Sequence, residues 1–270
     1  MTNHPAPTPL GPIRTYLAIG DSFTEGMSDP DPHNPHAYRG WADLLATRLA
    51  TTNPGLRYAN LAVRGKLIRQ ITTDQTPHAA TLTPDLTTLA GGLNDVLRPR
   101  CDLPAVKATL EQAAETLAAH SGHLVLFRST DPTRRLKSSA RLMPRIEQLV
   151  DFVDELGTRH HATVVDLFTA RAFDDPRLWA TDRLHLSTEG HRRVTEAVSQ
   201  ALGLPHDPDW ATPLPPAPPA PWLTQRKADA QWARTHLGPW IGRRLTGRSS
   251  GDNRPPKHPQ PTPWPPTPAN

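Results

Sequence analysis

Five short apolar runs, separated by segments with the spacing of amphipathic helices, constrain the fold of this chain more than any other feature. The runs are nearly continuous in apolar residues, as expected of strands that are buried on both faces. They span residues 14–19, 56–63, 86–90, 124–128 and 163–168. Helical patterns lie between and after them, at residues 41–49, 67–71, 103–120, 146–156 and 187–202.

Strands that alternate with helices form a parallel sheet with helices on both faces. Because crossover connections are right-handed, we expect an α/β fold of the doubly wound kind, a three-layer α/β/α sandwich with a five-stranded parallel sheet that is either flavodoxin-like or Rossmann-like. Ligands bind such sheets beyond the carboxyl ends of the strands. Ser22, Gly65 and Asn94 each follow the end of a predicted strand. The sequence therefore predicts that three turns meet at one edge of the sheet.

The last quarter of the chain differs in composition from the rest. From residue 206 onward it holds sixteen of the 32 prolines, five of the seven tryptophans and all of the net charge of +4. We expect a disordered lead at 1–12, a globular body at 13–205, a proline-rich linker at 206–221, a basic Trp-rich helical segment at 222–246 and a disordered proline-rich tail at 247–270.

Cysteine usage and hydropathy indicate the compartment. The single cysteine, Cys101, allows no intramolecular disulfide. No apolar run has the length of a signal peptide or of a membrane span. We expect a cytoplasmic protein, with no cofactor and no metal, since no cluster of residues has the spacing of metal ligands.

The stretch Gly20-Asp21-Ser22 closes the first apolar run and exposes a serine at a strand end, where a nucleophile would be rigid and accessible. The same stretch also suits an ordinary turn. A base is available late in the chain, because Asp182 precedes His185 by three residues and can orient its imidazole. An isolated pair of this spacing also suits a partly buried loop histidine.

Two further turns offer donors for an oxyanion. Asn94 carries a side-chain amide on a glycine turn, and Gly65 offers a backbone N–H with no side chain in the way. Preorganised donors of this kind stabilise tetrahedral intermediates, and the loss of one typically costs about 10²–10³ in rate.

In chain order, Gly20-Asp21-Ser22 with Gly26, Asn60 to Gly65, Gly92 to Asp95 and Asp182 to His185 resemble the four motif blocks of the SGNH (GDSL-type) hydrolase family. The resemblance covers about residues 14–202. It implies a flavodoxin-like α/β/α sandwich with a five-stranded parallel sheet and a serine ester hydrolase, with residues 13–205 as its catalytic domain. It departs at Phe23, where the family name has leucine.

The resemblance also implies a role for each site residue. Ser22 would be the nucleophile, His185 its base and Asp182 the residue that orients the base. The oxyanion hole would consist of the backbone N–H groups of Ser22 and Gly65 and the amide of Asn94. Asp21 and Gly20 would support the turn without reacting.

The partner expected from these residues is a small-molecule ester. The polar loops at 27–38 and 129–144 favour short acyl groups, or a substrate with an anionic or carbohydrate part. A thioesterase, a lysophospholipase or an acyltransferase with the same site remains an alternative. The basic Trp-rich segment suggests a different class, a binding module that contacts nucleic acid or a membrane surface. A helix that docks its tryptophans on the body explains the same pattern and makes such contacts the weaker hypothesis.

Overall fold

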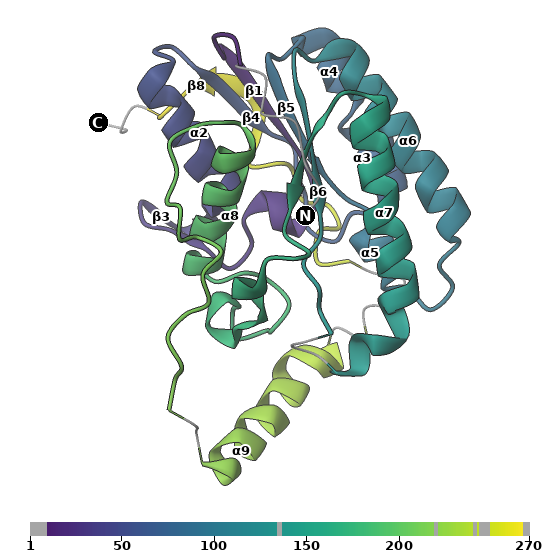
Figure 1. Ribbon diagram of the computed structural model, residues 1–270, viewed down its shortest axis with the longest axis vertical. Coiled ribbons are helices and arrows are strands. Elements are labelled where there is room, and N and C mark those ends of the chain that lie inside the picture. Colours follow the sequence, from purple (N-terminus) through teal and green to yellow (C-terminus); the bar gives the residue numbers. More distant parts are fainter. Residues whose placement is uncertain (1–9, 134–136, 219–220, 240–241, 243–248, 267–270) are drawn as a thin grey trace.

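The apolar runs form the central sheet of the computed structural model (Figure 1), which describes residues 10–133, 137–218, 221–239, 242 and 249–266. Five parallel strands have the order β4-β1-β5-β6-β7, and a sixth strand, β8, pairs with β4 at the edge. In chain order the parallel strands lie 2-1-3-4-5, the flavodoxin-like arrangement. This confirms the predicted fold, although the sheet has six strands and not the predicted five. They are β1 (Thr15–Gly20), β4 (Arg57–Asn60), β5 (Leu86–Ala90), β6 (Leu124–Arg128) and β7 (Thr163–Asp166).

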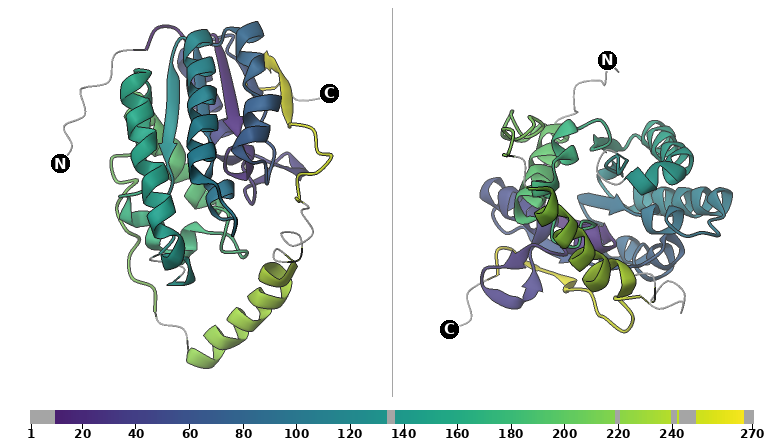
Figure 2. Two further views of the ribbon diagram at one scale, coloured as in Figure 1. Left: turned by 90° about the vertical axis from the view of Figure 1, so that its right-hand side faces the viewer. Right: turned by 90° about the horizontal axis from the view of Figure 1, so that it is seen from below.

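Helices cover both faces of this sheet, as Figures 1 and 2 show. One face packs against α2 (Gly40–Thr52) and α8 (Thr188–Ala201) around a core that includes Trp41 and Phe173. The opposite face forms a second core with four helices. These are α3 (Ile68–Asp74), α4 (Pro77–Leu82), α6 (Leu103–His120) and α7 (Met143–Arg159).

Short elements fill the connections between these layers. A hairpin of β2 (Pro30–Asp31) and β3 (Asn34–Tyr38) follows the first helical turn. The single-turn helices are α1 (Ser22–Glu25) and α5 (Leu93–Val96). The 3₁₀ turns are η1 (Lys137–Leu142), η2 (Arg171–Asp174) and η3 (Pro176–Leu178).

Polar caps fix where two of the long helices begin. The Asp102 carboxylate accepts a hydrogen bond from Ala105 N at 3.1 Å, which satisfies one of the free N–H groups at the start of α6. Ser187 Oγ accepts from Gly190 N at 3.3 Å at the start of α8. The helix predicted at 187–202 therefore begins at Ser187, its N-cap, two residues after His185.

The expectation of disorder for residues 247–270 is wrong for the described part, residues 249–266. There β8 (His258–Pro263) pairs antiparallel with β4, and Trp264 N donates to Leu56 O at 2.9 Å. Every second residue of β8 is a proline, so the missing N–H groups all face one side of the strand. The other side keeps its N–H groups for pairing, which is how a proline-rich segment can serve as an edge strand.

The remaining terminal segments connect to the body in different ways. Most of the predicted lead, residues 1–9, lies outside the described residues, while Leu10 packs against the core. The basic Trp-rich segment contains α9 (Trp222–Trp232) and a π-helical turn, η4 (Ala233–Leu237). In Figure 1, α9 lies below the sheet, outside the two helical layers. Among the described residues, no helix is both long and apolar enough to cross a membrane.

Candidate active site

Ser22 lies at the point where β1 passes into α1. Asp21 is the N-cap of this single turn, and its Oδ1 accepts from Phe23 N at 3.0 Å. Gly20 is required before it, because a Cβ there would lie 2.6 Å from both Ala90 O and Thr24 Oγ1. The turn is thus fixed from both sides, and Ser22, its first helical residue, stays partly exposed.

Asn94 links this turn to the turns that follow β4 and β5. Its Nδ2 donates to Asp21 Oδ2 at 2.9 Å and to Lys66 O at 3.2 Å. Three turns that are far apart in sequence therefore meet at the carboxyl edge of the sheet, as the strand pattern predicts. Both hydrogen bonds are donated by the amide nitrogen that the sequence predicts to be an oxyanion donor.

The Asp21 carboxylate is buried within this junction. Burial raises its pKa to about 6, although hydrogen bonds from Phe23 N and Asn94 and the nearby charge of His185 act in the opposite direction. Within the described residues no hydrogen bond joins Ser22 Oγ to His185, and such catalytic hydrogen bonds often tighten only when substrate binds.

Glu25 and Arg64 form a second link between the first two turns, which the sequence reasoning did not identify. The Glu25 carboxylate accepts from Arg64 N at 2.6 Å and from Arg64 Nε at 2.9 Å, and it also contacts the terminal Nη2. The guanidinium lies 5.0 Å from the centre of the Tyr38 ring. Because Arg64 directly precedes Gly65, this ion pair fixes the backbone that presents the Gly65 N–H. The sequence does hold a signal for this ion pair, because Glu25 lies inside the first motif block and Arg64 inside the second.

Gly65 adopts a left-handed conformation with φ of 74°. A Cβ at this position would lie 2.1 Å from Ser249 Oγ, so the C-terminal segment approaches the Gly65 backbone closely. Glycine meets both demands, since it tolerates positive φ and has no side chain. This approach of residue 249 cannot be read from the sequence.

Asp182 and His185 form the hydrogen-bonded pair that their spacing predicts. Asp182 Oδ2 lies 2.6 Å from His185 Nδ1. The other oxygen, Oδ1, accepts from Leu184 N at 2.9 Å and from His185 N at 3.0 Å. Burial alone would raise the pKa of Asp182, but these hydrogen bonds and the charge of His185 outweigh it and lower the pKa to about 2. Asp182 is thus an ionised acceptor that holds the imidazole by one nitrogen.

Helix α9 contacts the loop that carries this pair. Trp232 Nε1 donates to Asp182 O at 2.8 Å. Arg183 lies between the loop and the helix, with an ion pair of 2.7 Å to Asp229 and its guanidinium 5.0 Å from the centre of a Trp232 ring. Trp222, at the other end of α9, is 68% exposed. One tryptophan of the segment is therefore docked on the body and one is not, while Trp240, Arg243, Arg244 and Arg248 lie outside the described residues.

The described part of the chain contains no group of three or more His, Cys, Asp or Glu side chains arranged to hold a metal ion. The site combines a serine, an imidazole oriented by a carboxylate, and backbone N–H donors. Groups of these kinds can carry out nucleophilic attack on an acyl group.

Comparison with known proteins agrees with this geometry. The model of the GDSL-like Lipase/Acylhydrolase family matches residues 18–193, a span that includes every candidate site residue. No curated protein matches the chain significantly.

Solved structures show the same fold at low identity. LAE5, an alpha/beta hydrolase enzyme from the metagenome of Lake Arreo, Spain, is 24% identical with a TM-score of 0.58, over 70% of this chain and 94% of LAE5. Axe2, an acetylxylan esterase from Geobacillus stearothermophilus, is 18% identical with a TM-score of 0.60, over 73% and 98% of the two chains. TesA is 19% identical with a TM-score of 0.57, over 70% of this chain and 97% of TesA.

Proposed function

Since the chain belongs to the GDSL-like lipase/acylhydrolase family and is a carboxylic-ester hydrolase, we propose that Ser22, His185 and Asp182 are its catalytic triad. The observation that carries this proposal is the contact of 2.6 Å between Asp182 Oδ2 and His185 Nδ1. A carboxylate on Nδ1 fixes the tautomer in which Nε2 is free to accept the proton of a serine hydroxyl.

In the proposed mechanism, Ser22 Oγ attacks the ester carbonyl while His185 Nε2 takes its proton. The alcohol leaves with that proton, and an acyl-enzyme remains. A water molecule activated by the same imidazole then attacks the acyl-enzyme, which releases the acid and restores Ser22. Asp182 stays ionised throughout, in line with its low pKa.

We propose that the backbone N–H groups of Ser22 and Gly65 and the Asn94 amide stabilise the oxyanion. The Glu25–Arg64 ion pair supports this role for Gly65, because it holds the preceding peptide. Asn94 Nδ2 has a shorter bond to Asp21 and a longer one, 3.2 Å, to Lys66 O. The longer bond is the one that we expect to yield to the oxyanion, which leaves the link to Asp21 intact. Asp21 and Gly20 support the turn.

We propose short acyl groups, acetyl above all, as the substrates. The hairpin of β2 and β3 bears Asp31, Asn34 and no large aliphatic side chain, which suits a small acyl group better than a long chain. The similar fold of Axe2, named as an acetylxylan esterase, favours the same class. Thioesters, lysophospholipids and acyl transfer to another acceptor are the alternatives that the same serine chemistry allows.

A panel of esters with graded acyl length, together with acyl-thioesters and a lysophospholipid, tests this function on the wild type and on Ser22→Ala. We expect rates to be highest for acetyl and propionyl esters and to fall by more than 10³-fold in Ser22→Ala and in His185→Ala. Asp182→Ala should lose less, because its role is orientation. Full activity in Ser22→Ala would show that another residue is the nucleophile.

A further inference from the structure

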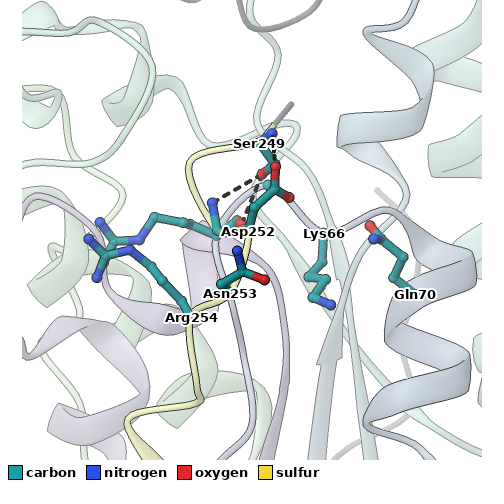
Figure 3. A pocket seen from close by; sticks show the side chains of 9 residues that line it. Lys66, Gln70, Ser249, Asp252, Asn253 and Arg254 are labelled. Carbon is teal, nitrogen blue, oxygen red and sulfur yellow. Dashed lines mark hydrogen bonds between the residues drawn. The ribbon is translucent and has the colours of Figure 1, made fainter. Parts of the chain in front are cut away.

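A polar cavity of about 500 Å³ lies beside Gly65, between the loop after β4 and the C-terminal segment. Figure 3 shows Lys66 and Gln70 on one side of it and Ser249, Asp252 and Asn253 on the other. Among the described residues, no apolar side chain contributes to its lining. The residues that line it are Arg64, Gly65, Lys66, Gln70, Ser249, Gly251, Asp252, Asn253 and Arg254.

The two basic residues on the body side are already paired. Arg64 is held by Glu25, and Lys66 Nζ lies 2.7 Å from Asp74 Oδ2. On the tail side, Arg254 is accompanied by Asp252 in the lining. Among the described residues that line the cavity, each basic side chain therefore has a carboxylate to match it, so this lining carries no excess positive charge that would favour a phosphate or a polyanion.

Three side chains keep unused hydrogen-bonding groups. Gln70 accepts from Leu67 N through Oε1 at 3.0 Å, which leaves its NH₂ group available. Arg254 uses Nε for Ser250 O at 3.3 Å, and within the described residues its two terminal nitrogens have no partner. The Asn253 amide is likewise without a partner among the described residues. Its backbone has φ of 61°, a conformation that asparagine adopts more readily than most residues.

Amide and guanidinium donors without excess charge match the hydroxyl groups of a neutral, hydroxyl-rich molecule. The polar side chains of the described lining argue against an acyl chain as the occupant, because an apolar chain gains nothing from a polar wall. We propose that this cavity binds the alcohol part of the ester, and that this part is a neutral carbohydrate. The proposal rests on the proposed function, in which Gly65 stabilises the oxyanion and the leaving alcohol departs nearby.

The C-terminal segment is seated closely enough to form a defined site. A Cβ at Gly251 would lie 1.9 Å from Arg64 O, so the two backbones touch. Ser249 Oγ accepts from Gly251 N at 3.1 Å and lies 3.4 Å from Arg64 O. Strand β8 then anchors the segment to β4. Residues 249–254 lie outside the family match, which ends at residue 193, so the specificity would come from a part of the chain that the family model does not describe.

The test compares two acetyl esters, an acetylated oligosaccharide and p-nitrophenyl acetate, on Asn253→Ala, Arg254→Ala and the double variant. Gln260→Ala and Arg226→Ala are the matched controls. Gln260 is exposed on β8, Arg226 is exposed on α9, and neither side chain lines the cavity. For the double variant we expect kcat/KM on the sugar ester to fall about 10-fold or more, through KM, and to fall much less on p-nitrophenyl acetate. The controls should leave the ratio of the two activities unchanged.

A second measurement follows binding without turnover. Titration of the unacetylated oligosaccharide into Ser22→Ala should give saturable binding that weakens by a similar factor in Asn253→Ala/Arg254→Ala. Equal losses on both esters, or an unchanged ratio together with unchanged sugar binding, would overturn the carbohydrate assignment. Sugar deacetylation that persists in Ser22→Ala would instead overturn the proposed function, so the two failures are distinguishable.

Discussion

The indole Nε1 of Trp232 donates a hydrogen bond of 2.8 Å to the main-chain carbonyl of Asp182, the residue that holds His185 by its Nδ1. A helix beyond the matched family region thus reaches the loop of the proposed base. The backbone of the intervening Arg183 has φ of 59°, a conformation that costs about 1 kcal/mol or more in a residue other than glycine. Contacts from α9 to Arg183 and Asp182 offset that cost.

Trp232→Phe should therefore lower kcat several-fold while KM for a small ester stays unchanged. The phenyl ring keeps the stacking on Arg183 but removes the N–H that fixes Asp182 O, a bond of about 1 kcal/mol. Trp222→Phe is the matched control, because Trp222 lies on the same helix and is 68% exposed. Steady-state kinetics of both variants check the prediction, and an equal loss in the two would contradict it.

The low pKa of Asp182 predicts a pH-dependent contribution to stability. Its folded value, about 2, lies below the ordinary 3.8, so the carboxylate stabilises the protein above about pH 4, and this contribution is lost as the pH falls toward 2. The shift corresponds to a contribution on the order of 2 kcal/mol. Denaturant unfolding of the wild type and Asp182→Asn between about pH 2.5 and about pH 7 should give a difference in unfolding free energy that shrinks on acidification. A constant difference would show that Asp182 titrates normally.

Asp21 predicts the opposite trend. Burial raises its pKa from 3.8 to about 6, so its ionised form costs stability above about pH 6 and the cost disappears as the carboxyl is protonated. Asp21→Asn removes this cost but also weakens the bonds to Phe23 N and Asn94 at every pH. The change in Tm caused by Asp21→Asn should therefore be more favourable at about pH 8 than at about pH 5. Thermal unfolding at the two pH values measures it, and the reverse order would contradict the buried position of the charge.

Glu25→Gln should destabilise the protein by about 2–4 kcal/mol, because it leaves the largely buried Arg64 guanidinium without its counter-charge. It should also lower kcat, since the peptide before Gly65 loses its anchor. Asp74→Asn provides the comparison, because the Lys66–Asp74 pair is more exposed and should contribute less than about 1 kcal/mol. Chemical unfolding of both variants tests the difference. Similar values would mean that the Glu25–Arg64 pair is no more important than a surface pair.

Local sequence patterns predict the features that depend on neighbouring residues. The continuous apolar runs predict the parallel strands, because a strand buried on both faces has no polar side. The three-residue spacing predicts the contact between Asp182 and His185, since one turn brings the two side chains together. Ser187 likewise indicates the start of α8, because a serine hydroxyl at a helix start can accept a hydrogen bond from an N–H group in the first turn.

Local sequence patterns do not predict the features that depend on residues far apart in the chain. The sequence does not predict strand β8, because its prolines suggest disorder and their alternation becomes significant only once the strand pairs with β4. The helical pattern at 146–156 ends before Gly157, but α7 continues to Arg159, and Gly157 allows the Val164 side chain to approach the helix. The seating of Trp232 and Ser249 against the proposed site likewise requires the folded chain.

The most direct test of the central claim is covalent labelling by a fluorophosphonate, followed by mapping of the modified peptide with mass spectrometry. We predict one label per chain, on Ser22, with a rate that falls strongly in His185→Ala and is abolished in Ser22→Ala. A label on another residue, or labelling of Ser22→Ala at the rate of the wild type, would contradict the assignment of Ser22 as the nucleophile.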